Sequence, residues 1–387
     1  MPEAVIVATA RSPIGRAYKG SLIEVRADDL AGFAINALME KVPEVDRASV
    51  NDVILGCGLT HHEQGFNLAR PASLLGGMPD VVPATTVNRF CASSLQTIRM
   101  AFHAISRGDG DTYVAAGSES VSRTYGRAMD SEDLNPRFTD SSRDDYINNV
   151  YIPMGNTAEN VARRHGITRV RQDEFAKRSQ DRAVEAQKNG FFDSEITPIE
   201  LPDGRAVRDD DGPRPNTTLE KLAELPPVFD PEGTVTAGNS CPLNDGSAAV
   251  LVMSADRARD LGLVPLARIV ASSVAGLEPE YMGMGPVFAV RRVLDQAGMT
   301  LGEIDIIELN EAFAAQVLAC VDELGIDMDK LNPHGGAIAL GHPFGMTGAR
   351  IMGTLLNDLR VMDATCGLET MCVGGGQGMA MIVERLS

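Results

Sequence analysis

Residues 90–105 read FCASSLQTIRMAFHAI, in which a cysteine and small residues precede a run of helical periodicity. Apolar side chains recur at helical spacing from Leu95 onward, so we expect a helix that begins near Ala92 or Ser93. Residues 341–356, GHPFGMTGARIMGTLL, repeat this plan with a histidine ahead of the helix. A chain that builds the same unit twice is expected to pack the two units together.

A strand-like segment precedes each of these helices at a similar distance. The apolar segments DVILGCG and IDIIELNEAFA share one pattern. Asp52 lies 39 positions before Cys91, and Asp305 lies 37 positions before His342. The spacing predicts two related halves of βαβ type.

Further apolar runs of strand length alternate with helical patterns along both halves. Strands are predicted over residues 4–10 and 112–120, and a helix over residues 29–42. Residues 369–383 predict a strand, a glycine turn and a second strand. Such alternation indicates an α/β sandwich around a mostly parallel sheet.

A region of different character separates the halves. We divide the chain into an N-terminal half over residues 1–119, completed by about 241–265, an inserted domain over 120–240, and a C-terminal half over 266–387. The insert contains a helical pattern over residues 169–190, and we expect short helices without sheet alternation. Insertions at the ends of parallel strands commonly cover an active site.

Composition narrows the class of protein. Hydrophobic residues make up 44% and charged residues 23% of the chain, which is typical of a globular protein. A net charge of −18 argues against nucleic acid or an anionic membrane as a partner, although a local pocket can still be basic. No apolar run approaches the roughly 18 residues of a spanning helix.

The cysteines are scattered without CxxC spacing or a disulfide-dense pattern. This usage predicts a reducing, cytoplasmic location with thiols available for chemistry. The six are Cys57, Cys91, Cys241, Cys320, Cys366 and Cys372.

Cys91 stands at the predicted N-terminus of a helix. Unpaired N–H groups and the helix dipole favour an anion there, so a thiolate at this place is expected to have a lowered pKa. The alternative is a small buried cysteine of purely structural role.

His342 lies among glycines that allow close backbone approach to a substrate, and an imidazole there could act as base to a thiol. Cys372 precedes the glycines of CVGGGQG, where a thiol can donate a proton and N–H groups can bind an oxyanion. A dinucleotide-binding turn is rejected, since too few residues follow it for a helix and second strand. A structural role remains the alternative for His342.

Asn310 follows an apolar strand, where its amide could orient water or an acyl oxygen. Its alternative role is to cap the helix that follows. The pair His61 and His62 with Glu63 invites a metal, but no cysteine or second carboxylate stands at ligand spacing, so a solvated loop is preferred.

Seven segments in order resemble the thiolase family, enzymes of acyl-CoA carbon–carbon cleavage and condensation. They run from residue 11 to residue 378 and read RSPIG, VNRFCASSLQ, MGNTAENVA, GTVTAGNSCPLNDGSAA, NEAFA, GGAIALGHPFGMTGAR and CVGGGQG. The resemblance implies the thiolase fold, a five-layered αβαβα sandwich with an inserted CoA-binding loop domain, in a homodimer or homotetramer.

The resemblance also implies catalytic roles. Cys91 would be the nucleophile that takes the acyl group as a thioester. His342 would activate it and form one oxyanion site with a water held by Asn310. Cys372 would be the acid or base at carbon, and the backbone N–H groups of Cys91 and Gly374 would form a second oxyanion site. No metal or redox cofactor is expected, because coenzyme A is a substrate.

Other matched positions are implied to bind CoA. Arg214 would lie near the adenine nucleotide, and the pantetheine would run past Met154, Phe229, Cys241, Ala312 and Phe313. Three positions depart from the family pattern. Cys241 replaces a serine, Pro153 replaces the histidine of short-chain enzymes, and His334 stands where asparagine is common.

The expected function is cleavage of 3-ketoacyl-CoA to acetyl-CoA and a shortened acyl-CoA, as in fatty acid β-oxidation. The alternatives are acetoacetyl-CoA synthesis in the condensing direction and a non-catalytic, thiolase-like acyl-CoA or lipid-binding protein. A ketoacyl-ACP synthase would not need Cys372. Chain length, a steroid side chain and the physiological direction stay open.

Overall fold

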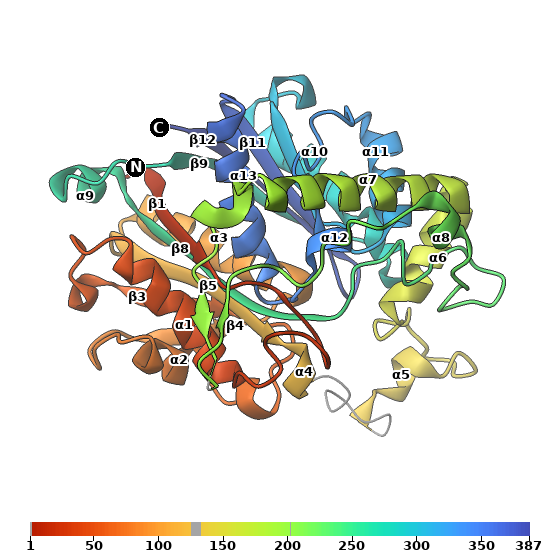
Figure 1. The fold of residues 1–387 in the computed structure, drawn as a ribbon, viewed down its shortest axis with the longest axis horizontal. Helices are drawn as coiled ribbons and strands as arrows, with labels where there is room; N and C mark the ends of the chain where they lie inside the picture. Colours follow the sequence, from red (N-terminus) through yellow and green to blue (C-terminus); the bar gives the residue numbers. More distant parts are fainter. Residues whose placement is uncertain (1, 125–132, 202) are drawn as a thin grey trace.

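The computed structural model describes residues 2–124, 133–201 and 203–387. These residues form one ten-stranded sheet in the order β10-β11-β12-β9-β1-β8-β5-β3-β4, with β2 (Gly15–Arg16) beside β8. Only two residue pairs join β1 to β9, so this contact links the sheets of two halves. Figure 1 shows β1, β3 and β5 in red to orange, β8 and β9 in green to teal, and β11 and β12 in blue.

The two halves repeat one strand arrangement. In the first, β1 (Ala4–Arg11), β8 (Asn244–Ser254), β5 (Thr112–Ser120), β3 (Asp52–Gly56) and β4 (Ala84–Val87) follow one another. In the second, the matching order is β9 (Ala267–Gly276), β12 (Gln377–Arg385), β11 (Cys366–Val373) and β10 (Ile306–Leu309). A single parallel bridge from Ile307 to Leu331 takes the place of β4.

The sheet is mixed, so the prediction of a mostly parallel sheet is wrong. The pairs β3–β4, β3–β5 and β10–β11 are parallel, whereas β8 and β12 run antiparallel to both of their neighbours. A three-residue glycine turn joins β11 to β12, and so short a connection can only make an antiparallel pair.

Alternation along the strands produces five layers. Ile6 faces the inner core with α3 (Ser93–Arg107) and α13 (Thr347–Val361), whereas Val5 faces α1 (Ala27–Glu40) and α2 (Ala69–Leu75). In β12, Met381 joins the inner core and Ile382 faces α10 (Gly285–Ala297) and α11 (Ala314–Leu324). The layers are therefore helix, sheet, paired inner helices, sheet and helix.

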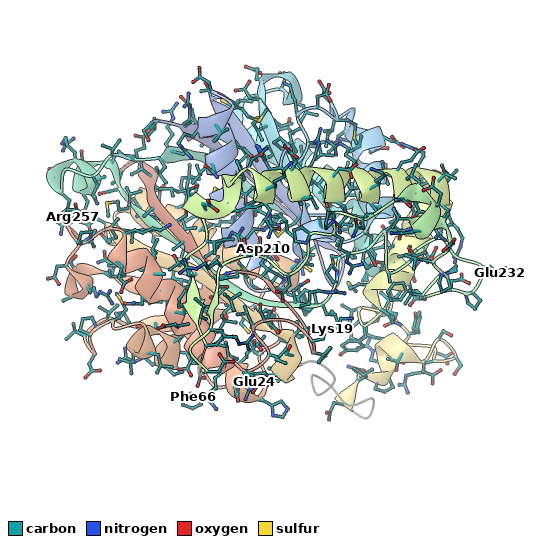
Figure 2. The ribbon with its side chains drawn as sticks, viewed as in Figure 1. Lys19, Glu24, Phe66, Asp210, Glu232 and Arg257 are labelled. Carbon is teal, nitrogen blue, oxygen red and sulfur yellow. The ribbon has the colours of Figure 1, made fainter. Side chains whose placement is uncertain are left out.

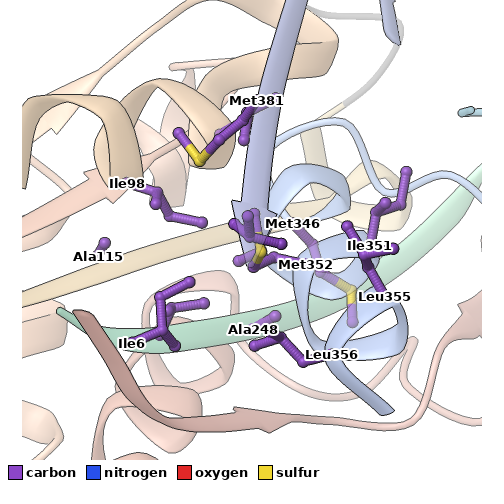
Figure 3. Packing of buried hydrophobic residues seen from close by; sticks show 14 of the residues in the cluster. Ile6, Ile98, Ala115, Ala248, Met346, Ile351, Met352, Leu355, Leu356 and Met381 are labelled. Atoms are coloured by element: carbon purple, nitrogen blue, oxygen red, sulfur yellow. The ribbon is translucent and has the colours of Figure 1, made fainter. Parts of the chain in front are cut away.

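Figure 3 shows the inner core, where side chains of both halves interdigitate. Ile6, Ala115 and Ala248 from the N-terminal sheet lie close to Met346, Met352 and Leu355 of the α13 region. Packing of this density holds the starts of α3 and α13 in a fixed relation.

The segment between β5 and β8 contains the helix that the pattern over residues 169–190 predicts. α7 (Arg169–Lys188) crosses the face of the molecule in Figure 1, and α6 (Met154–His165) precedes it. A small two-stranded sheet of β6 (Ile199–Glu200) and β7 (Ala206–Val207) follows, so a minor sheet is also present. The remaining short elements of this segment are α4 (Val121–Thr124), α5 (Pro136–Thr139) and α8 (Leu219–Ala223).

A buried ion pair ties this segment to the N-terminal half. Arg11 of β1 donates two hydrogen bonds to Asp210, at 2.9 and 3.0 Å, and a third to Glu195 at 2.9 Å. Figure 2 labels Asp210 in the middle of the molecule. Breaking a pair this deeply buried leaves an uncompensated charge, so the contact anchors the segment firmly.

None of the helices in the described part of the chain is both long and apolar enough to cross a membrane.

Candidate active site

Cys91 lies between β4 and α3, in a short turn that leads into the helix. A 3₁₀ turn spans Phe90–Ala92, and α3 begins at Ser93 as the periodicity predicts. The Ser93 hydroxyl donates to the Phe90 carbonyl and accepts from the Arg89 N–H, which closes the turn. Phe90 adopts a φ of 44°, a left-handed conformation that a bulky residue seldom takes.

Two backbone N–H groups point at the Cys91 sulfur, from Gly374 and from Cys91 itself. Burial nevertheless raises the pKa of this thiol to about 11, with a further small rise from the charge of Glu119. The expectation of a lowered pKa is therefore wrong in direction, because desolvation of the thiolate outweighs the N–H groups. Cys91 is a protonated thiol near neutral pH and needs a base.

Cys372 lies near the end of β11 and is fully buried. Burial raises the pKa of its thiol well above the usual range, and the charges of Cys91, Cys320 and Cys241 raise it further. Gly374, two residues on, donates its N–H to Cys91, so the two thiols share one site. Gly375 and Gly376 then reverse the chain with φ values of 75° and 82°.

His342 lies ahead of α13 and pairs with Asn310, which follows β10. The Nε2 of His342 is 3.4 Å from the Asn310 Nδ2, and its Nδ1 is 2.6 Å from the Thr347 hydroxyl. That hydroxyl donates its one proton to the Pro343 carbonyl at 2.8 Å, so Nδ1 must carry the imidazole proton. Nε2 therefore carries a lone pair, which faces the Asn310 amide N–H and can act as a base.

Burial lowers the pKa of His342 to about 3, so the imidazole is neutral near pH 7. The Oδ1 of Asn310 is buried and has no hydrogen-bond partner among the described residues. A buried carbonyl oxygen of this kind fits a bound water or a polar group of a ligand.

The predicted pantetheine residues gather beside Cys372. Ala312, Phe313 and Cys372 belong to one small apolar cluster, against which Met154 and Cys241 pack. The Phe229 ring meets Phe313 edge-on at 6.1 Å. The Cys241 N–H donates to the Ala312 carbonyl at 3.0 Å, which links these two segments in a short strand-like pair.

Arg214 is the one CoA candidate outside this cluster. Its backbone N–H donates to Gln180 of α7 at 2.8 Å, and its exposed guanidinium has no ion-pair partner among the described residues. No contact of Arg214 with Cys91 or Cys372 is found, so its role stays a prediction.

A cavity of about 400 Å³ opens beside Cys91. Its walls come from five parts of the chain: the loop after β3, the turn before α3, the segment that leads into α6, the loop before α13, and the turn after β11. The lining residues are Gly58, Leu59, Phe90, Cys91, Leu134, Val150, Tyr151, Ile152, Met154, Phe344, Gly374 and Gly375. Phe344 also packs edge-on against His342 at 5.2 Å, which connects the imidazole to the cavity of the thiol.

Glu119 supports this site and was missed by the sequence analysis. It is fully buried near the end of β5, and it accepts hydrogen bonds from the N–H groups of Gly58, Leu59 and Gly345 at 2.8 to 3.1 Å. Gln64 donates to it as well at 2.6 Å. Glu119 is the single charged residue in the strand-like run TYVAAGSES, and this is the signal that could have identified it.

The departures from the family pattern lie in different places. Pro153 is the residue directly before α6 and so precedes Met154 at the cavity wall. His334 stacks on Phe191 at 3.6 Å and lies 2.5 Å from Asp358, outside the cavity lining.

The His61 and His62 pair does not form a metal site. Glu63 is engaged by Arg26 and Arg123, which hold its pKa at about 2. Across the residues that the structure describes, no group of three His, Cys, Asp or Glu side chains could hold a metal ion.

The fold thus gathers two buried thiols and a buried imidazole near one cavity, an arrangement suited to an enzyme. Family models for the thiolase N-terminal domain and the thiolase C-terminal domain match residues 4–256 and 263–385. The chain therefore belongs to the thiolase family, and it is an acyltransferase.

Similar proteins cover the whole chain. The beta-ketoadipyl-CoA thiolase of Pseudomonas aeruginosa is 45% identical over 99% of both chains. The 3-ketoacyl-CoA thiolase of Aeromonas hydrophila is 46% identical over 100% of both. Among solved structures, the acetyl-CoA acetyltransferase of Bacillus anthracis (39% identity, TM-score 0.91) and human mitochondrial 3-ketoacyl-CoA thiolase (38%, 0.89) each match 100% of this chain and 99% of their own.

Proposed function

We propose that this thiolase cleaves 3-ketoacyl-CoA with CoA to give acetyl-CoA and an acyl-CoA shortened by two carbons. The observation that carries the proposal is the shared site of two buried thiols, Cys91 and Cys372, beside an apolar cavity. The names of similar proteins, 3-ketoacyl-CoA thiolase among them, support the same reaction.

In the first half-reaction, His342 Nε2 takes the proton of Cys91, and the thiolate attacks the 3-keto carbon. The bond between carbons 2 and 3 breaks, and its electron pair stays on the acetyl-CoA carbon, which takes a proton from Cys372. The products are acetyl-CoA and an acyl thioester on Cys91. The N–H groups of Cys91 and Gly374 supply one oxyanion site, and a water held by Asn310 together with His342 supplies the other.

In the second half-reaction, the Cys372 thiolate takes the proton of incoming CoA. The CoA sulfur attacks the thioester carbonyl, the acyl group leaves with CoA, and the Cys91 thiolate regains its proton from His342. Cys91, His342 and Cys372 each return to their starting protonation state, and no group is oxidised or reduced. The proposed cycle therefore uses no metal or redox cofactor. One site serves both directions, and the supply of substrates then decides between cleavage and condensation.

The CoA arm is proposed to pass between Phe229 and the pair Ala312 and Phe313, with Met154 and Cys241 beside it. This path is supported by their common packing next to Cys372. Arg214 would meet the nucleotide end, since a free guanidinium suits phosphate and adenine alike.

We propose further that the protein is a homo-oligomer. β4 pairs only with β3 among the described strands, and exposed apolar side chains occur around it. They are Phe66, which Figure 2 labels on the rim, and Leu74, Leu75 and Val81. A second copy pairing along this edge would cover them. We also propose a cytoplasmic location, because catalysis by thiols needs reduced cysteines. The domain boundaries are proposed at residues 119, 240 and 265, because β8, which follows the inserted segment, pairs with β1 and β5 of the first half.

The test is thiolysis by the purified protein on 3-ketoacyl-CoA substrates of increasing chain length, followed by loss of the enolate absorbance. Cys91→Ala is the control and should be inactive. Activity that survives in that variant would contradict the assigned nucleophile. No activity at any length, with acyl-CoA still bound, would favour the non-catalytic alternative.

A further inference from the structure

Among the residues that the structure describes, no charged side chain lines the cavity beside Cys91. Of its lining side chains, only the Tyr151 hydroxyl and the Cys91 thiol carry a polar atom. The other side chains are apolar: Leu59, Phe90, Leu134, Val150, Ile152, Met154 and Phe344.

This cavity is distinct from the proposed path of the CoA arm. Phe229, Ala312, Phe313 and Cys241 do not line it, and Met154 alone belongs to both sets. With CoA on the first path, the cavity is the space left for the acyl chain attached to Cys91.

Four described arginines in or near the segments that line the cavity are paired with other residues. Arg89 donates to Gln96 and Gln377, and Arg123 donates twice to Glu63. Arg137 and Arg143, in the segment that carries Leu134 and Val150, both pair with Asp145. None of these cations lines the cavity.

The polar group directly behind the wall is an acid. A Cβ atom on Gly58 would come within 2.9 Å of Glu119, so this carboxyl lies immediately outside the lining. Glu119 accepts hydrogen bonds from its neighbours and supplies no positive charge to a second carboxylate. An unpaired carboxylate that leaves water for such surroundings carries a large desolvation penalty.

We infer that the acyl chain taken by this site is apolar and uncharged to its end, and that the enzyme discriminates against 3-ketoacyl chains that end in a carboxylate. The inference rests on the proposed function. The inference makes beta-ketoadipyl-CoA a poor substrate of this enzyme, although proteins named beta-ketoadipyl-CoA thiolase are 45% identical to this chain.

The test compares 3-ketohexanoyl-CoA with beta-ketoadipyl-CoA, since the two six-carbon chains differ only in a terminal methyl or carboxylate. We expect kcat/KM for the methyl-ended substrate to be at least 100-fold higher, and to rise further with one or two added methylenes. Values within threefold of each other, or a preference for the carboxylate, would overturn the inference while leaving the proposed function intact. Cleavage of neither substrate would instead contradict the proposed function.

Val150→Lys places an ammonium group in the cavity wall, where Val150 lies 3.4 Å from the position of a Cβ on Gly375. The ratio of kcat/KM for the carboxylate substrate to that for the methyl substrate should rise at least tenfold. Ile147→Lys is the matched control, because Ile147 is 41% exposed in the same segment and does not line the cavity. It should leave the ratio unchanged, and an unchanged ratio in folded Val150→Lys would overturn the inference.

If Val150→Lys fails to fold, Val150→Phe provides a second test. The larger ring narrows the cavity without adding charge, so activity on 3-ketohexanoyl-CoA should fall at least tenfold relative to acetoacetyl-CoA. Equal effects on both substrates would show that the chain does not enter this cavity.

Discussion

Glu119 and Cys372 occupy the same place in the two halves of the molecule. Each lies near the end of a strand that has a parallel neighbour on one side and an antiparallel one on the other. Glu119 lies opposite Gly246 of β8, and Cys372 lies opposite Gly378 of β12. Both are fully buried, yet one is a carboxyl surrounded by N–H donors and the other is a thiol beside further thiols.

The residues that follow the neighbouring strands differ in the same way. Cys57, directly after β3, contacts Glu119 through its sulfur at 3.7 Å, whereas Asn310, directly after β10, contacts His342. A duplicated architecture thus carries one site. At these matching strand ends, the C-terminal half carries the thiol and the amide of the proposed site. The N-terminal half, which contributes Cys91 from the start of α3, uses its own strand ends to hold loops of the cavity wall.

Replacing Cys372 should have the largest effect and should separate the two half-reactions. Cys372→Ala removes the proton for carbon, so thiolysis should fall on the order of 10³-fold. Exchange of labelled CoA into acyl-CoA includes no proton transfer at carbon. It uses Cys372 only as base to the CoA thiol, which can also lose its proton to water, so the exchange rate should fall far less. Cys366→Ala, at the other end of β11, is the matched control and should keep both rates. An equal loss of both rates in Cys372→Ala would contradict a role at carbon.

Replacing Glu119 should affect both half-reactions together. Glu119→Gln turns one acceptor oxygen into a donor that faces backbone N–H groups, so we expect a loss of about 2 kcal/mol in the free energy of unfolding. Misplacement of the cavity wall should lower thiolysis and exchange alike, by about 100-fold. Urea unfolding and the two rate assays measure this. If Glu119→Gln lost thiolysis but kept CoA exchange, the result would contradict a positioning role and would indicate that Glu119 acts as a second acid at carbon.

Arg214 lies outside the duplicated part of the chain, and its replacement should affect binding alone. Arg214→Ala should raise KM for CoA substrates about fivefold and leave kcat nearly unchanged, the pattern of lost uniform binding. Arg208→Ala removes an exposed arginine of the same segment and is the control. An unchanged KM in Arg214→Ala would remove this residue from the CoA site.

Titration of His342, in the C-terminal half, should also affect stability. Burial lowers the pKa of folded His342 to about 3 from a usual value of 6.5, so the unfolded chain binds this proton first as the pH falls. Stability therefore falls with decreasing pH below about 6.5. Between pH 7 and pH 5 the wild type should lose about 2 kcal/mol more than His342→Asn in urea unfolding. Equal losses would show that His342 does not contribute.

Local pattern was sufficient for many elements. The run TYVAAGSES is β5 to the residue, α3 begins at the predicted Ser93, and the glycine turn after Cys372 joins two strands. These features depend on side-chain periodicity and on glycine, both of which can be read along the chain. Strand direction could not be read in this way, and the mixed sheet was therefore missed.

The sequence by itself determined the residue types of the site, the presence of two related halves in the chain and the family to which the chain belongs. Tertiary structure alone decided the electrostatics and the shape. Burial, and not the helix N-terminus, sets the pKa of Cys91, and the Thr347 hydroxyl selects the imidazole tautomer. The uncharged cavity wall is also assembled from segments far apart in the chain. Desolvation and cavity shape depend on every neighbour in space, and no local pattern records them.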